Sequence, residues 1–301
     1  MVRKKLIVAV VVLLVPVLLA CGLVGAGQTL ASFRGGGQVG LISIEGAIVS
    51  SSGSGFALGG EASDRRVIAE LEAAEADRNI SAILLYINSP GGSVVASDEI
   101  YRALTRMEKP VVAYAGEMAA SGGYYVACGA DRIVAHPSSI VGSIGVISQV
   151  ILLEELLDDL GVDIETIKSG DAKDMGSPVR PLTEEERAFL QAIVDQSYQL
   201  FVDVIVESRG LSREEVLAVA DGRVLSGQDA LELGLVDELG GLREAVLAAG
   251  ELAGISGEPE VVSIGQPPSF LEILLSALWE GNPLEALRPD RGPSLEYRAL
   301  R

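Results

Sequence analysis

The pattern of apolar and polar positions predicts strands that alternate with helices along most of the chain. Residues 81–88 (SAILLYIN) and 110–116 (PVVAYAG) are nearly continuous apolar runs, as expected of parallel strands covered on both faces. Weaker or shorter patterns complete the set, so that the predicted strands are residues 38–49, 81–88, 110–116, 131–136, 162–168 and 222–226.

Apolar residues at helical spacing fill the segments between these strands. The predicted helices cover residues 64–80, 94–107, a stretch after Ser121, 182–208, 211–219, 227–234 and 241–253. The first follows Ser63 and Asp64, a plausible helix cap. Strands that alternate with helices predict an α/β fold of stacked parallel βαβ units.

The N-terminus predicts a membrane anchor. Arg3, Lys4 and Lys5 precede an uninterrupted apolar run of 21 residues, Leu6 to Ala26, which as a helix would be about 31 Å long and could span a bilayer. The basic residues favour a cytoplasmic N-terminus, which places the body outside the cytoplasm. A cleaved signal peptide, or a lipoprotein signal ending at Cys21, are the alternatives.

Composition predicts how the chain is divided into segments, and the net charge argues against nucleic-acid binding. We expect an anchor or signal segment at 1–27, a flexible tether at 28–37, one folded domain at 38–258 and a tail with a short amphipathic helix at 259–301. The net charge of −19 would repel phosphate backbones, so nucleic-acid binding is not expected. Cys21 and Cys128 are expected to be unpaired.

Two glycine turns mark the candidate site. The stretches YINSPGGS and MAASGGYY each follow a predicted buried strand and open a helix. Open α/β sheets bind ligands at the carboxyl ends of their strands. Two such turns can aim backbone N–H groups at one point, which is the arrangement of an oxyanion hole.

Ser121, in the second turn, has two interpretations. A serine before a helix most often caps it, because its hydroxyl satisfies an otherwise unpaired backbone N–H. A serine between small residues at a strand-to-helix turn can also be a nucleophile, which needs a base. The sole histidine of the chain, His136, has no obvious carboxylate to orient it, so we expect a packed histidine and not a member of a triad.

A lysine is the other base available to a serine. After Lys109 only Lys168 and Lys173 remain, both in the stretch TIKSGDAKDMGSPVR. Lysines in such a loop are usually solvated, and a lysine acts as a base near pH 7 only if burial lowers its pKa from about 10.4 by about three units. That would require the loop to dock against the serine turn.

Five ordered motifs resemble the signal peptide peptidase A family in its short single-domain form. They are YINSPGG, MAASGGYYVA, VGSIGVI, IKSGDAKDMGSPVRPLTEEE and DGRVLSGQDALELGLVDELGG, and they span about residues 39–250. The resemblance implies the fold shared by caseinolytic protease subunits and crotonases. It also implies a Ser/Lys dyad that cleaves remnant signal peptides in the membrane.

Matching the motifs position by position implies the site residues. Ser121 matches the nucleophile, Lys173 the general base and Lys168 a noncatalytic lysine. Gly92 and Gly122 match the oxyanion-hole donors, and Ser143 is a candidate for orienting the lysine. Caseinolytic proteases carry a catalytic histidine where this chain has IVGSIGVI, so the lysine must replace it.

The resulting expectation is a single-pass membrane protein with an extracytoplasmic serine endopeptidase domain. It needs no cofactor or metal, and its partners are short apolar peptides, such as cleaved signal peptides, and further copies of itself in a ring-like homo-oligomer. The alternatives are a crotonase-type acyl-CoA enzyme and an inactive scaffold at the membrane.

Overall fold

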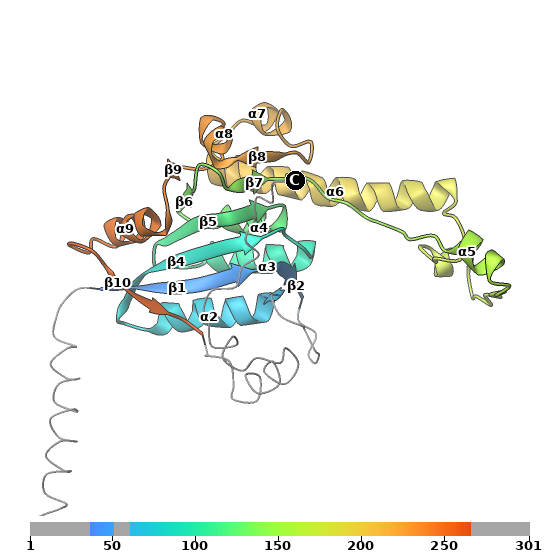
Figure 1. Cartoon of the computed structure of the whole chain (residues 1–301), viewed down its shortest axis with the longest axis horizontal. Helices are drawn as coiled ribbons and strands as arrows, with labels where there is room; N and C mark the ends of the chain where they lie inside the picture. Colours follow the sequence, from blue (N-terminus) through green and yellow to red (C-terminus); the bar gives the residue numbers. More distant parts are fainter. Residues whose placement is uncertain (1–36, 51–60, 266–301) are drawn as a thin grey trace, which may run out of the picture. The chain divides into compact units, whose positions relative to one another are not determined.

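The computed structural model describes residues 37–50 and 61–265, which fold around a mostly parallel sheet (Figure 1). Its strands are β1 (Gln38–Glu45), β4 (Ile80–Ser89), β5 (Val111–Ala120), β6 (Arg132–Ala135), β7 (Ile140–Gly142), β8 (Val224–Ser226), β9 (Glu238–Leu239) and β10 (Glu260–Ser263). The order is β10-β1-β4-β5-β6-β9, with all neighbours parallel. β7 pairs in parallel with the end of β5 and antiparallel with β8. Separately, β2 (Ala47–Val49) pairs with β3 (Glu61–Ser63).

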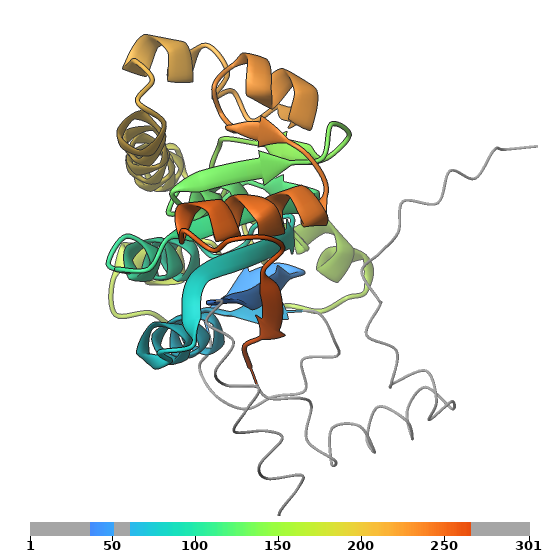
Figure 2. The ribbon, with the colours of Figure 1, turned by 90° about the vertical axis from the view of Figure 1, so that its left-hand side faces the viewer.

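Helices cover both faces of this sheet. They are α2 (Asp64–Ala76), α3 (Val94–Leu104), α4 (Gly122–Ala127), α5 (Glu154–Asp159), the 3-10 helix η1 (Asp171–Asp174), α6 (Glu184–Arg209), α7 (Arg213–Leu217), α8 (Gly227–Glu232) and α9 (Leu242–Leu252). Leu71 of α2 and Ile100 of α3 are buried in one apolar cluster, and Ala245 and Ala249 of α9 in another. Figure 2 shows α2 and α3 side by side and α9 apart from them.

Side-chain caps fix where several helices begin. Ser63 accepts a hydrogen bond from the backbone of Arg66 and so caps α2, which confirms the predicted helix start. Ser93 caps α3 in the same way. Thr183 and Glu186 form a reciprocal capping box at the start of α6, the longest helix described.

The predicted α/β alternation is confirmed, with one wrong element. Residues 162–168 form no strand, and every residue from 161 to 173 is exposed. Their alternation fits a strand, but in the described residues they pair with no other strand. β10 lies within the segment assigned to the tail and pairs with β1.

The predicted anchor (1–27), nearly all of the tether (28–37) and the amphipathic tail helix lie outside the described residues. Among the helices in residues 37–50 and 61–265, none combines the length and apolar character needed to cross a bilayer.

The chain leaves the sheet between β7 and α6. This excursion, residues 146–183, carries α5 and η1, neither of which has a buried residue. Figure 1 shows α5 near the start of α6 and away from α4 and the sheet. The excursion therefore holds apolar side chains that residues 37–50 and 61–265 leave exposed, and Ile167 is 94% exposed.

Candidate active site

The carboxyl ends of three neighbouring strands meet at the candidate site. β4 ends at Ser89 and continues through Gly91 and Gly92 into α3, while β5 ends at Ala120 directly before Ser121. β7 pairs with the end of β5, with Ala120 opposite Gly142. Parallel pairing thus brings three segments that are distant in sequence to one edge of the sheet.

The first glycine turn packs tightly against the second. Gly91 has a φ of 95°, and a Cβ atom there would lie 2.5 Å from the backbone nitrogen of Gly122 and 2.9 Å from Cβ of Ser121. A Cβ atom on Gly92 would lie 2.1 Å from the backbone oxygen of Ile48, whose strand bridges to this turn. Only glycine allows these approaches.

Ser121 is held in a strained backbone conformation and does not cap α4. Its φ is 51° and its ψ is −120°, and its side chain makes no capping hydrogen bond. Such a conformation costs roughly 1–3 kcal/mol and is concentrated at functional sites. The cap interpretation is therefore wrong for the hydroxyl. No hydrogen bond joins that hydroxyl to any residue in 37–50 or 61–265.

Two backbone N–H groups border the same position. A Cβ atom on Gly122 would lie 3.2 Å from the backbone nitrogen of Gly92, so the two nitrogens are close together. Within the described part of the chain, neither N–H donates a hydrogen bond. Unpaired donors beside a serine hydroxyl can stabilise the oxyanion of a tetrahedral intermediate.

Helix α4, which begins at this position, is fixed by two buried tyrosines. Tyr124 donates a hydrogen bond to the backbone oxygen of Leu235 at 2.7 Å, and Tyr125 donates one to Asp98 of α3 at 2.8 Å. Burial is the main cause that raises the pKa of both phenols, so both stay protonated donors at working pH. The N-terminal end of α4 is thus anchored from two sides.

Ser143 leaves β7 beside Ser121. The backbone N–H of Ser121 donates a 2.7 Å hydrogen bond to the oxygen of Gly142, and Ser143 has a φ of 52°. These two serines are the only non-glycine residues with positive φ in the described ranges. The structure therefore brings together four of the five predicted site residues: Ser121, Gly92, Gly122 and Ser143.

Lys173, the fifth, is not brought to Ser121 within one chain. It is exposed in η1, on the excursion that Figure 1 shows away from α4. Lys168 lies in the same excursion and pairs with Asp174 at 2.8 Å. A single copy thus brings the predicted nucleophile and the predicted donors together and holds the predicted base elsewhere.

His136 lies just beyond β6 and is exposed, so the expectation of a packed histidine is wrong. Its Nδ1 accepts a hydrogen bond from the backbone of Ser138 at 3.2 Å. Among the described residues, no carboxylate pairs with its ring. The histidine therefore lacks the orienting partner that a triad requires.

Ser97 is a neighbour of the site that the sequence analysis missed. It is buried in α3, where its hydroxyl donates to the backbone oxygen of Ser93 at 2.9 Å. A Cβ atom on Gly122 would lie 2.4 Å from this hydroxyl oxygen. The one available signal was the spacing of Ser93 and Ser97, one helical turn apart.

This contact predicts a specific rescue. We expect Gly122→Ala to lower the free energy of unfolding by about 1–3 kcal/mol through overpacking, and Ser97→Ala by about 1 kcal/mol through the lost hydrogen bond. The double variant should lose clearly less free energy of unfolding than the two single variants added together, because Ser97→Ala removes the oxygen that the new methyl group contacts. Denaturant unfolding of the four proteins at one concentration measures this coupling. Strict additivity would contradict the predicted contact.

Comparisons with known proteins agree with this geometry. The model of peptidase family S49 matches residues 103–256, and the Clp protease model matches residues 58–141. The chain is 43% identical over 197 residues to a Methanocaldococcus jannaschii protein named "Putative protease", covering 65% of this chain and 63% of that protein. It is 35% identical over 208 residues to the "Putative signal peptide peptidase SppA" of Enterococcus faecium, covering 68% and 60%.

A plant relative extends the match. The chain is 34% identical over 262 residues to the chloroplastic serine protease SPPA of Arabidopsis thaliana, covering 85% of this chain and 37% of that protein. The chain spans less than two thirds of the length of these three relatives. The S49 match covers just over half of the chain and includes the strained serine turn and the lysine loop. With the mixed α/β sheet and its converging strand ends, it shows that the chain belongs to peptidase family S49, the family that includes the signal peptide peptidases A.

Proposed function

We propose that this chain is a membrane-anchored serine endopeptidase that degrades remnant signal peptides and other short apolar peptides. The observation that carries the proposal is Ser121 at a positive φ, with an uncommitted hydroxyl beside the N–H groups of Gly92 and Gly122. The name of the Enterococcus relative supports the choice of substrate. The 21-residue apolar run after three basic residues supports an anchor with the body outside the cytoplasm.

The chemistry follows from these groups. Oγ of Ser121 attacks the scissile carbonyl while Nζ of Lys173 takes its proton, and the N–H groups of Gly92 and Gly122 bind the resulting oxyanion. Each donor is worth about 2.7–4 kcal/mol in such reactions. The lysine then gives the proton to the leaving amine. Water, activated by the same lysine, hydrolyses the acyl-enzyme and regenerates Ser121.

We also propose that Lys173 reaches the serine of a neighbouring subunit in a ring-like homo-oligomer. Lys173 lies on the excursion, which exposes many apolar side chains: Ile147, Ile151, Leu152, Leu156, Leu160, Ile164 and Ile167. Exposed apolar surface of this extent marks an interaction site. A second copy of the chain is the partner that suits this surface, because within one copy Lys173 lies away from Ser121. Repeated head-to-tail contacts between copies can close into a ring.

A fluorophosphonate probe, which reacts with activated serines, tests the proposed function on the full chain in detergent. We expect labelling of Ser121 in the wild-type chain, because the probe reacts only with an activated serine. Lys173→Arg should abolish labelling, since arginine stays protonated, whereas Lys168→Ala should keep most of it. Mass spectrometry of the labelled peptide identifies the serine.

The other outcomes separate the alternatives. Absence of labelling in the wild-type chain under all conditions would favour an inactive scaffold or an acyl-CoA enzyme, neither of which needs a serine nucleophile. Labelling that survives Lys173→Arg and disappears in Lys168→Ala would move the base to Lys168.

A further inference from the structure

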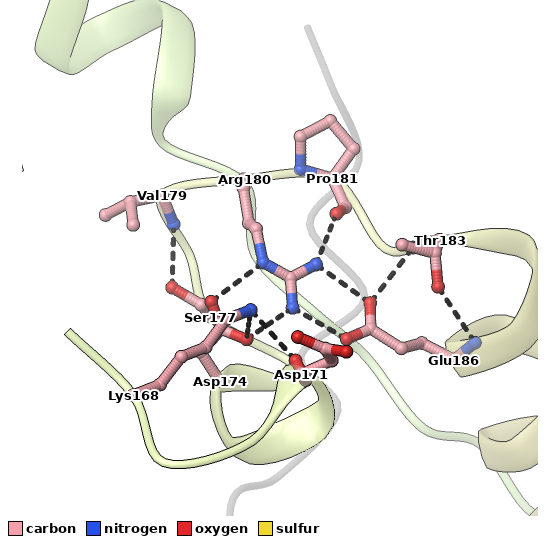
Figure 3. Close-up of polar contacts among 9 residues, drawn as sticks. All are labelled: Lys168, Asp171, Asp174, Ser177, Val179, Arg180, Pro181, Thr183 and Glu186. Atoms are coloured by element: carbon pink, nitrogen blue, oxygen red, sulfur yellow. Dashed lines mark hydrogen bonds and ion pairs between the residues drawn. The ribbon is translucent and has the colours of Figure 1, made fainter. Parts of the chain in front are cut away.

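One arginine lies at the centre of the loop that carries the proposed base. The guanidinium of Arg180 donates through Nε and Nη2 to the two carboxylate oxygens of Asp174, at 2.9 and 2.7 Å (Figure 3). It donates through Nη1 and Nη2 to both oxygens of Glu186, at 2.8 and 2.6 Å. Nη1 also donates to the backbone oxygen of Pro181 at 3.0 Å.

This guanidinium joins two structural elements. Asp174 is the last residue of η1 and follows Lys173 directly, while Glu186 belongs to the first turn of α6. Glu186 is itself fixed, because its carboxylate accepts a 3.0 Å hydrogen bond from the backbone N–H of Thr183. Arg180 therefore ties the end of η1 to the rigid start of a 26-residue helix.

Polar contacts are what fix this part of the loop. η1 has no buried residue, so no apolar core determines its position. Lys168 adds a 2.8 Å bond to Asp174 and another to the backbone oxygen of Asp171 (Figure 3). It reaches only one carboxylate, whereas Arg180 bridges two with a planar fork that lysine cannot reproduce.

The bridge persists across the pH range of an assay. Hydrogen bonds from Arg180 are the main cause that holds the pKa of Glu186 at about 2 and places the pKa of Asp174 well below its usual value. Both carboxylates are therefore ionised at neutral and alkaline pH, and the two-sided ion pair does not open as pH rises from 6 to 10.

We infer that Arg180 is a positioning residue, which holds Lys173 in the geometry needed to take the proton from Ser121 by tying η1 to α6. The inference rests on the proposed function, in which Lys173 is the base. Arg180 contacts neither reacting atom. Its effect is on the placement of the base, and a displacement of about 1 Å in a catalytic group can cost about 10²-fold in rate.

The experiment removes the guanidinium and then supplies it from solution. We expect Arg180→Ala in the full chain to lower kcat for a fluorogenic apolar peptide by about 10- to 100-fold. KM should change by less than about two-fold, because the side chain is assigned no contact with substrate. Guanidinium chloride at about 10–50 mM, far below denaturing concentrations, should restore about ten-fold of kcat by filling the vacated fork between Asp174 and Glu186.

Three controls make the rescue specific. Sodium chloride at equal ionic strength should not restore activity, and Arg180→Lys should stay impaired. Arg243→Ala removes a far more exposed ion pair, which joins Arg243 near the start of α9 to Glu258, and should leave kcat and its response to guanidinium unchanged. Glu186 is buried and the side chain of Asp174 is only 13% exposed, so Arg180→Ala should also lower the unfolding midpoint, and kcat is measured well below that midpoint.

Two results would overturn the inference. One is a kcat of Arg180→Ala equal to that of the wild-type chain while Lys173→Arg is inactive. Lys173 would then act as the base without being positioned by Arg180. The other is a loss of kcat that guanidinium does not relieve in a variant that is folded and assembled. If Lys173→Arg is itself active, the proposed base is wrong, so failure of the proposed function is recognised separately.

Discussion

Replacing Ser121 by alanine is expected to lower kcat for peptide cleavage by at least about 10³-fold, as for other serine nucleophiles. The hydroxyl is the only part of the side chain that the proposed reaction uses, and no described residue depends on it as a hydrogen-bond partner. Folding should be nearly unchanged, because alanine meets the same backbone strain as serine. Hydrolysis of a fluorogenic apolar peptide and denaturant unfolding measure the two effects.

Ser121→Gly is the matched variant, and it separates the chemistry from the strain. Glycine adopts a φ of 51° without a Cβ penalty, although it gains entropy in the unfolded chain. We expect Ser121→Gly to be as inactive as Ser121→Ala and more stable by about 1 kcal/mol. The wild-type chain would thus give up stability to hold a nucleophile at this turn.

Either part of this prediction can fail. Peptide turnover by purified Ser121→Ala equal to that of the wild-type chain would remove Ser121 from the mechanism. A Ser121→Gly protein that is less stable than Ser121→Ala would show that the positive φ is not a source of strain.

The central strands were predictable because their patterns are long and apolar. β4 and β5 match the predicted runs 81–88 and 110–116, extended by a few residues at their ends. The two-residue strand β9 carries too few positions to show any period. Residues 162–168 show the opposite error, a predicted strand that does not form. Alternation of apolar and polar residues shows only that an extended segment would have two different faces. Whether such a chain pairs depends on a partner strand, which one sequence does not reveal.

The glycines of the site were predictable, because the backbone there leaves no room for a side chain. Gly91, Gly92 and Gly122 stand where a Cβ atom would clash, and glycine turns at strand ends are visible in a sequence. The strain at Ser121 and Ser143 was not predictable, because tertiary contacts impose it. Ser97 was missed because Gly122 becomes its neighbour only in the fold. Arg180 was missed because a spacing of six residues is not a helical or strand spacing that predicts a contact. Arg180 meets Asp174 and Glu186, each six residues away along the chain.

Mixing two inactive variants is expected to restore activity, if serine and lysine come from different subunits. Ser121→Ala and Lys173→Ala are each expected to be inactive alone. In a mixed head-to-tail ring, a complete site forms where a Lys173→Ala subunit supplies the serine and its neighbour, a Ser121→Ala subunit, supplies the lysine. Random mixing in equal amounts produces this pairing at about one site in four.

The structure gives a reason to expect this result and not its opposite. Ser121 lies at the sheet edge, whereas Lys173 lies on the exposed excursion that Figure 1 shows away from α4. If each chain supplied both groups to its own site, the excursion would have to fold back onto its own sheet. Its exposed apolar side chains instead suit a neighbouring copy.

The measurement is peptide turnover after the two variants are unfolded together and reassembled, with mixing confirmed by native mass spectrometry. The matched control replaces Lys173→Ala by the double variant Ser121→Ala/Lys173→Ala, which supplies an interface and no serine, and should recover nothing. Recovery near a quarter of the wild-type rate supports the shared site, because each active site then draws on two chains. Persistent inactivity in rings that contain both variants would assign serine and lysine to the same chain, and the excursion would then have to close over its own sheet during catalysis.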